Sequence, residues 1–454
     1  MISRPKLTLL ATIIGSGIVI LDGTVVNLAL PHIASNLHAS FADLQWITDG
    51  YLLSLSALIL LGGSLGDIFG RKKMYLLGLL GFGAASLLCG LSPNPTVLIL
   101  TRILQGIFGA LLVPGGLAII NTNFPAAERG AAIGSWSAWS AVFAALGPLV
   151  GGYILDITTW RWIFLINVPL VVVCYVVGQA SIQDSRDANP RKVDVPGATL
   201  ASVALAGLTY GLIEGPARHW KLGAVLPLAL GVLSSVLFLW YERRAKDPMV
   251  KLDLFKSRNF SGSNLMTFMM YGALGGFIFA LVIFLQTHLH YSSIKAGVSL
   301  LPLTILLVLF SKRVGRLSAN FGPRLFMTAG PLIAGIGILS LVRLQASSGY
   351  VTSVLPGVLL FAAGITLMVA PLTTTVMTSV ADTSSGIASG INNAVSRVAG
   401  LIVVALLGLF GSGEFYKFAI ILCGSMALAA GLLSWFIIRN PAKPKLAKAE
   451  TATP

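Results

Sequence analysis

The chain has 454 residues and a net charge of +15, with only 10% charged residues against 56% hydrophobic ones. Soluble domains carry about 25% charged residues, so this composition excludes an ordinary soluble fold and indicates a chain surrounded mostly by lipid. The three cysteines lie in apolar runs without paired spacing or nearby histidine clusters, which predicts neither a disulfide framework nor a metal site.

Fourteen apolar runs follow one another along the chain, and each is long enough for a helix that crosses a hydrocarbon core of ~30 Å. The first six form one group, two more follow as a pair, and six form a last group. Helices are therefore expected at residues 7–30, 46–65, 74–91, 97–121, 131–155, 162–180, 195–213, 222–241, 264–286, 294–310, 325–344, 351–372, 386–410 and 416–438.

The positions of lysine and arginine orient these helices, because positively charged loops stay on the cytoplasmic side of a membrane. With both termini cytoplasmic, the inner loops and the two tails hold 23 of the 31 basic residues, and the outer loops hold six. Only an even number of helices gives this partition. The charge is thus explained without a nucleic-acid partner, and the basic loops can contact anionic membrane lipid. The sequence predicts a multi-pass protein of the cytoplasmic membrane.

Residues 63–73, between the second and third runs, recur in a weaker form that starts at Gly315, 252 residues after Gly63. Repeated halves are typical of secondary transporters. Eight units of helix plus loop, about 31 residues each, fit this offset, whereas six units would need about 42 residues each. Two extra helices are therefore expected between the halves. The expected organisation is a six-helix bundle at 1–181, an inserted helix pair with linkers at 182–258, a second six-helix bundle at 259–440, and a disordered cytoplasmic tail at 441–454.

Five segments in chain order resemble signatures of the major facilitator superfamily, and more narrowly of its fourteen-helix drug:proton antiporter branch. One position departs from the pattern, since Ile68 stands where the superfamily usually has arginine. The resemblance implies an all-α membrane fold of two six-helix bundles that alternate access to a central cavity. It also implies antiport, and hence export, because the fifth-helix segment accompanies antiport in family members. The five segments are residues 21–31, 63–73, 100–106, 147–152 and 160–169.

Asp22 is the only carboxylate expected deep within an apolar run, and Arg102 of the fourth helix lies at a similar depth. Burial favours the neutral form of a carboxyl group and a nearby cation favours its charged form. Such a group can therefore take up and release protons as it alternates between water and protein. The resemblance implies that the first and fourth helices both border the central cavity, so we expect Asp22 and Arg102 to interact, directly or through water. The alternatives are a structural hydrogen bond for Asp22 and an arginine that reaches the outer interface.

Two further polar residues lie in the first two helices. Asp49 is expected one turn into the second helix and near water, where it is a weaker proton site or else a solvated or capping carboxylate. Asn27 points about 140° away from Asp22 around the helix, so it is expected to bond a neighbouring helix.

The loop after the second helix carries Gly63, Gly66, Asp67, Gly70 and Arg71. Its glycines permit tight turns, and its acidic and basic residues can form ion pairs. The resemblance implies that Asp67 and Arg71 act as a latch, which holds the two halves together on the cytoplasmic side when the cavity faces outward. The alternative is that the basic residues only set the orientation of the chain.

The fifth-helix segment combines three glycines with a proline. Gly147, Gly151 and Gly152 leave one helix face without side chains, and Pro148 removes a backbone hydrogen bond and bends the helix. We expect close helix packing along a pliable seam.

Polar residues also begin the thirteenth run. Asn392, Asn393 and Arg397 lie there at membrane depth, where polar groups face the protein interior or a water-filled cavity. They are predicted to line the substrate path, with bonding between helices as an equal alternative.

These observations predict a proton-coupled antiporter that exports amphipathic or hydrophobic organic compounds and uses no cofactor. No nucleotide motif of the Walker type and no constellation of nucleophile, base and metal ligands occurs, so neither an ATP-driven pump nor an enzyme is expected. A proton-coupled transporter of a native metabolite and a non-transporting membrane sensor are the alternatives. The identity of the substrate and the oligomeric state cannot be read from the sequence.

Overall fold

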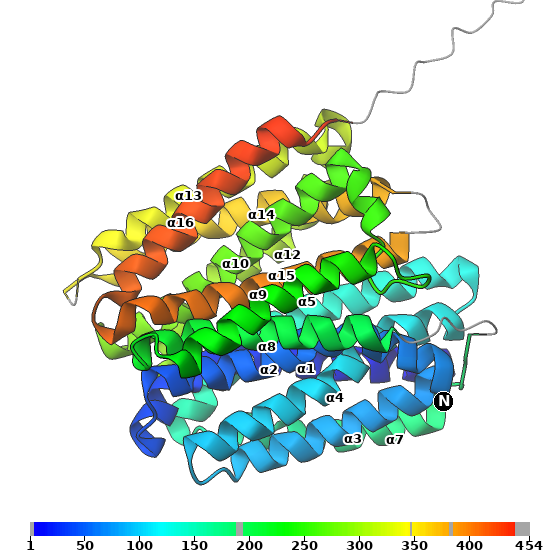
Figure 1. Ribbon diagram of the computed structural model, residues 1–454, viewed down its shortest axis with the longest axis horizontal. Helices are drawn as coiled ribbons and strands as arrows, with labels where there is room; N and C mark the ends of the chain where they lie inside the picture. Colours follow the sequence, from blue (N-terminus) through cyan, green and yellow to red (C-terminus); the bar gives the residue numbers. More distant parts are fainter. Residues whose placement is uncertain (1–3, 188–193, 346, 381–384, 441–454) are drawn as a thin grey trace, which may run out of the picture.

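The computed structural model describes residues 4–187, 194–345, 347–380 and 385–440, and in these residues the chain is all-helical (Figure 1). Thirteen helical segments are long and apolar enough to cross a membrane, and α5, apolar over Val142–Ile157, provides one more. The expected all-α membrane fold with about fourteen spans is thus confirmed. The expected tail at 441–454 lies outside the described residues.

The helices form two bundles, and a pair of helices lies between the bundles in chain order. The first bundle consists of α1 (Arg4–Leu37), α2 (Phe41–Phe69), α3 (Arg71–Gly90), α4 (Pro95–Asn123), α5 (Ala126–Ile157), α6 (Trp162–Leu165) and α7 (Asn167–Ser181). The pair is α8 (Val195–Ala217) and α9 (Leu222–Glu242). After the short η1 (Leu252–Lys256), the second bundle consists of α10 (Arg258–Thr287), α11 (Ser293–Val298), α12 (Leu301–Phe321), α13 (Pro323–Ser340), α14 (Leu355–Thr378), α15 (Ser385–Leu407) and α16 (Gly411–Ile437), with short turns at Leu341–Arg343, Tyr350–Val354 and Gly408–Phe410.

Several helices extend beyond the apolar runs that predicted them. Helix α1 continues through Pro31 into polar sequence as far as Leu37. Helix α2 begins at Phe41 because Ser40 and Asp43 form a capping box, in which each side chain accepts a hydrogen bond from the other residue's backbone N–H. The apolar run marks only the part of a helix that lies in hydrocarbon, so helix ends are missed by several residues.

The repeat in the sequence has a structural counterpart. Gly70 connects α2 to α3 with φ +106°, and Gly322 connects α12 to α13 with φ +86°, a backbone conformation that glycine adopts without strain. In each bundle the loop binds the chain that follows the last helix. Arg71 N donates to Ser185 O at 3.0 Å, and Arg324 N donates to Asn440 Oδ1 at 3.0 Å.

We call the end of the molecule that bears Arg4 and Ile437 the terminal face, and the opposite end, with Leu37 and Phe41, the distal face. In Figure 1 the second bundle slopes away from the first toward the terminal face. Hydrogen bonds between the bundles gather at the distal face. They run from Gln45 Nε2 to Val404 O at 2.7 Å, from Gln286 Nε2 to Leu28 O at 2.9 Å, and from the N–H groups of Ser293 and Ile294 to the Asp156 carboxylate at 2.9 and 3.2 Å.

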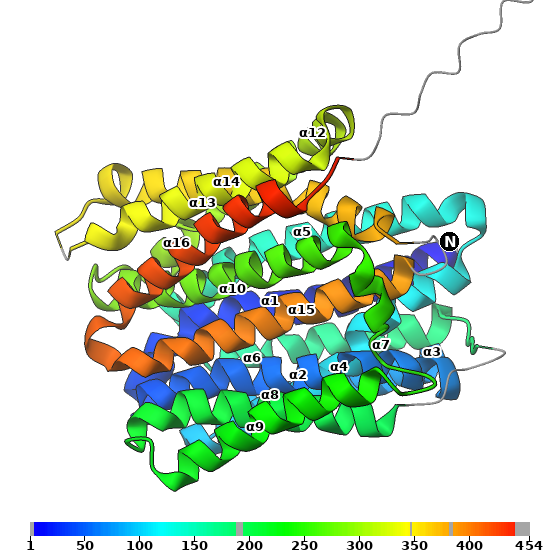
Figure 2. The ribbon, with the colours of Figure 1, turned by 45° about the horizontal axis from the view of Figure 1, so that its top comes forward.

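The inserted pair lies on one flank of the molecule (Figure 2). Helix α9 packs on α8, and α8 packs on both α2 of the first bundle and α15 of the second. Trp46 of α2 donates to Glu214 of α8 at 3.0 Å, and its ring lies 5.9 Å from that of Tyr210. The pair therefore covers one side of the seam between the bundles.

Candidate functional site

The site centres on a buried ion pair between α1 and α4. Arg102 Nη1 donates to Asp22 Oδ2 at 2.6 Å, and the two residues are 1% and 2% exposed. Arg102 Nε also donates to the Ile47 carbonyl of α2 at 3.0 Å. The structure thus brings together the two charged groups that the sequence analysis expected to interact, and an arginine reaching the outer interface is excluded.

The depth of Asp22 differs from the expectation. The expected helix at 7–30 would end eight residues, or ~12 Å, past Asp22, whereas α1 ends at Leu37, 15 residues or ~22 Å past it. The polar residues after Pro31 hid this extension from the analysis of apolar runs.

A polar network surrounds the carboxylate. Asp22 Oδ1 accepts hydrogen bonds from Gln105 Nε2 at 3.0 Å and Asn167 Nδ2 at 3.2 Å. The two amides also donate to Ser86 Oγ, at 3.2 and 3.0 Å. Buried polar groups cost free energy unless they are hydrogen-bonded, so this network offsets part of the cost of burying the Asp22–Arg102 pair. Sequence reasoning missed these three roles, although an amide within an apolar run was an available signal.

A cavity of about 400 Å³ lies beside the ion pair, between the two bundles. Its walls come from α1, α2, α4 and α5 on one side and from α10, α12 and α15 on the other. Pro148 of the fifth-helix segment is one of the lining residues. The walls are mostly apolar with a few polar groups, as is usual for sites that bind small organic molecules. The polar lining residues are Thr24, Asn27, Thr48, Tyr51, Arg102, Tyr271 and Thr304.

Two lining residues present polar atoms that have no hydrogen-bond partner in the described part of the chain. The Arg102 guanidinium stacks on the Tyr51 ring, with its Cζ atom 4.2 Å from the ring centroid. The buried Tyr51 hydroxyl has no hydrogen-bond partner among the described residues. Asn27 was expected to bond another helix, but its amide donates only to Gly23 O of its own helix at 3.4 Å, and its Oδ1 is unpaired.

The expectation that Asp49 lies near water was wrong. Its side chain is fully buried, and neither carboxylate oxygen has a hydrogen-bond partner among the described residues. Because α2 begins at Phe41, Asp49 lies two turns into the helix, and Asp43 is the capping carboxylate instead. Asp22 is therefore not the only deep carboxylate. A proton-carrying role for Asp49 stays a prediction.

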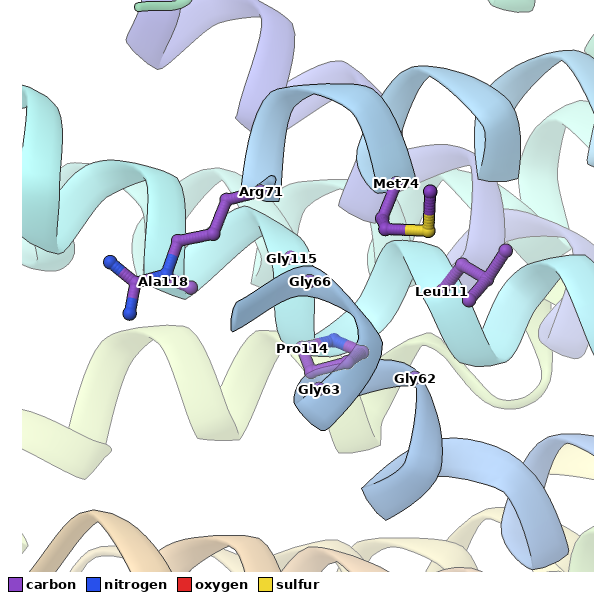
Figure 3. Close-up of a pocket in the computed structure, with 9 residues that line it drawn as sticks. All are labelled: Gly62, Gly63, Gly66, Arg71, Met74, Leu111, Pro114, Gly115 and Ala118. Atoms are coloured by element: carbon purple, nitrogen blue, oxygen red, sulfur yellow. The ribbon is translucent and has the colours of Figure 1, made fainter. Parts of the chain in front are cut away.

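The two charged residues of the predicted latch pair with each other. Asp67 and Arg71 form an ion pair at 2.7 Å, and Asp67 O accepts from Asp187 N at 3.1 Å in the segment after α7. In the described residues, no hydrogen bond or ion pair joins either side chain to the second bundle. Gly63 and Gly66 border a small cavity of about 20 Å³ between α2, α3 and α4 (Figure 3). Here the loop orders the terminal face of the first bundle.

The fifth-helix glycines lie at two close helix contacts. Gly147 and Gly151 face α1, where a Cβ atom on Gly151 would lie 2.5 Å from Val25 Cγ1. Gly152 faces α11 of the second bundle, and a Cβ atom there would lie 2.5 Å from Ile294 Cα. The missing side chains thus let α5 approach α1 and the second bundle at once.

The three polar residues of α15 that were predicted to line the substrate path lie in different surroundings. Asn392 donates to Asn264 Oδ1 at 3.1 Å and Thr267 Oγ1 at 2.7 Å on α10, so the alternative of bonding between helices applies to it. Asn393 is exposed and donates to a carbonyl of its own helix. Neither lines the cavity. Arg397 is half-buried one turn before the lining residue Gly400, but it is not itself among the residues that line the cavity.

Residues 12–404 match the sequence profile of the Major Facilitator Superfamily. The chain belongs to this superfamily. Its relatives include the tetracenomycin C resistance and export protein of Streptomyces glaucescens, 36% identical over 89% of this chain and 76% of the relative. The methylenomycin A resistance protein of Streptomyces coelicolor is 34% identical over 99% of this chain and 95% of its own length. These findings confirm the predicted family, whose members are transporters rather than enzymes.

Solved structures of major facilitators share the fold. A bacterial homologue of the human lysosomal transporter Spinster, in an inward-facing and unoccupied conformation, superposes with a TM-score of 0.71 at 16% identity, covering 96% of this chain and 97% of the other. The peptide transporter POT in complex with sulfate gives a TM-score of 0.72 at 14% identity, covering 96% and 98%. At these identities the likeness concerns the fold alone.

Proposed function

We propose that this major facilitator is a proton-coupled antiporter, which exports amphipathic or hydrophobic organic compounds across the cytoplasmic membrane. The observation that carries the proposal is the buried Asp22–Arg102 pair beside a cavity whose walls come from both bundles. The names of the relatives, which describe export of or resistance to tetracenomycin C, methylenomycin A and puromycin, support export of organic molecules.

Protonation of Asp22 couples the proton to the shape of the cavity. A neutral carboxyl group no longer compensates Arg102, and breaking a buried ion pair costs about 3 to 5 kcal/mol. A conformation that gives Arg102 another partner, or water, is then favoured over the present one. The proton thus acts as a ligand with different affinity for two states, which is the requirement for coupled transport.

The closed distal face supports an inward-facing state in the cycle. The distribution of lysine and arginine favours a cytoplasmic terminal face, and with that orientation closure at the distal face leaves the cavity facing inward. Substrate enters from the cytoplasm in this state. Outward opening then separates the Asp156 contacts, and the Asp67–Arg71 pair becomes available to latch the terminal face.

Reconstituted protein tests the proposal. Proteoliposomes with an imposed pH gradient and an enclosed pH-sensitive dye are exposed to tetracenomycin C, methylenomycin A, puromycin and further toxic compounds, and proton movement is followed. We expect compound-dependent proton movement that Asp22→Asn abolishes. The matched control is Asp253→Asn, which alters an exposed carboxylate paired only with Lys256.

The outcomes separate the alternatives. Proton-driven uphill transport that survives Asp22→Asn contradicts the proposed coupling. A transporter of a native metabolite would show net uptake in cells with a defined pH gradient, and a sensor would show no compound-dependent proton movement.

A further inference from the structure

A second arginine, Arg397 of α15, has no hydrogen-bond acceptor among the described residues. Arg397 lies on the same face of α15 as Gly400 and Val404, three and seven residues further on, and both of these line the cavity. Among the described residues, no hydrogen bond or ion pair joins its guanidinium to another group. An arginine keeps its charge and offers five donors, so a half-buried one that lacks a protein partner has room for another acceptor.

Unpaired groups on the facing wall point to the same conclusion. Tyr51 of α2 lines the cavity, and its hydroxyl is buried without a hydrogen-bond partner among the described residues. Asn27 Oδ1 on α1 is unpaired as well. Leaving such groups unsatisfied costs free energy, and a ligand with polar atoms at these positions would recover it. The three groups come from α1, α2 and α15, so a molecule that bonds them spans both bundles.

In the part of the chain that the structure describes, the cavity offers no acidic group that could bind a cation. None of the described lining residues is acidic. The nearest acid in the network is Asp22, whose Oδ2 is taken by Arg102 and whose Oδ1 already accepts from Gln105 and Asn167. Asp49 has carboxylate oxygens that are unpaired among the described residues, but it is not one of the residues that line the cavity. A permanently charged cation would therefore meet Arg397 without a carboxylate in the described cavity wall to compensate it, and like charges at close range repel strongly in a medium of low dielectric constant.

We propose that the cavity selects amphipathic molecules in which an apolar ring system carries a hydrogen-bond acceptor, namely a carboxylate, phenolate or carbonyl group. The ring system packs on Tyr271 and the apolar walls of α10 and α12, and the acceptor bonds Arg397 and the Tyr51 hydroxyl. Permanent cations are rejected. This inference deepens the proposed function by naming a substrate class, but the binding it describes does not depend on proton coupling.

Three probes with one ring skeleton test the inference: 2-naphthoate, 2-naphthamide and trimethyl(2-naphthylmethyl)ammonium. Their affinities are measured by titration calorimetry on the full chain in lipid nanodiscs. We expect 2-naphthoate to bind most tightly and the ammonium probe least. Arg397→Gln should weaken 2-naphthoate about tenfold to a hundredfold, as expected for a lost hydrogen bond to a charged group, and change the amide less. Tyr51→Phe should weaken 2-naphthoate about three- to tenfold.

Two variants control for charge and folding. Lys417→Gln removes one positive charge from an exposed position on α16 and should change no affinity. Arg397→Lys keeps the charge, so it should keep the preference for carboxylate over ammonium. This variant tests the role of the charge even if Arg397→Gln lowers thermal stability. The inference is overturned if no probe binds, if the ammonium probe binds as tightly as 2-naphthoate, or if Arg397→Gln preserves their ratio. Failure of the proposed function would instead appear as absent proton movement with this order of affinities intact.

Discussion

Closure of the distal face depends on a carboxylate of one bundle that caps a helix of the other. Asp156 accepts from Ser293 N at 2.9 Å and Ile294 N at 3.2 Å, at the first turn of α11. At this exposed site each bond is worth about 1 kcal/mol. Asp156→Ala should therefore destabilise the closed state by about 2 kcal/mol relative to the open state, which lowers the ratio of closed to open molecules by roughly 30-fold.

Pulsed electron resonance measures this shift directly. Spin labels on Ser35→Cys of α1 and Thr287→Cys of α10 report the distance between the bundles at the distal face, while the three native cysteines are buried. Asp156→Ala should move population from the short to the long distance. Asp43→Ala is the matched control, because it removes a capping carboxylate at the same face but within one bundle. An unchanged distance distribution in Asp156→Ala would refute the role of this contact.

Three further predictions follow from the geometry. Gly152→Leu should abolish transport while the protein still inserts into the membrane, because its side chain would collide with α11, and wild-type transport rates in this variant would show that the contact is dispensable. Asp67→Asn should slow turnover without weakening binding of compounds, measured as separate changes in maximal rate and affinity, and an unchanged rate would argue against a latch. Asp49→Asn should preserve thermal stability but lower the number of protons moved per substrate, and a constant ratio would exclude Asp49 from coupling.

The sequence predicted the fold well because membrane helices are defined by local composition. Apolar length, the distribution of lysine and arginine, and the Gly63 and Gly315 repeat each follow from the one-dimensional order of residues. The Asp22–Arg102 contact was also foreseen, because the two residues lie at a similar depth and the family resemblance implies that both of their helices border the central cavity. The helix ends were less accessible, because the capping box at Ser40 lies outside the apolar run, and this error misplaced Asp49.

The remaining site residues depend on how helices rotate against one another. Gln105, Asn167 and Ser86 come from three different helices, and only their packing brings them around one carboxylate. Asn392 and Arg397 lie five residues apart on α15, yet Asn392 bonds α10 whereas Arg397 forms no hydrogen bond with another described residue. Sequence spacing gives the angle between two residues on a helix but not the direction in which either of them points.

The position of α8 limits how the transporter can move. It packs simultaneously on α2 and α15, one from each bundle, and it is held to α2 by the Trp46 contact with Glu214. A change in the angle between the bundles must therefore slide α8 along at least one of these neighbours. The inserted pair cannot be a passive attachment on the lipid side, because each transport cycle has to shear and remake the surface that it shares with the moving parts.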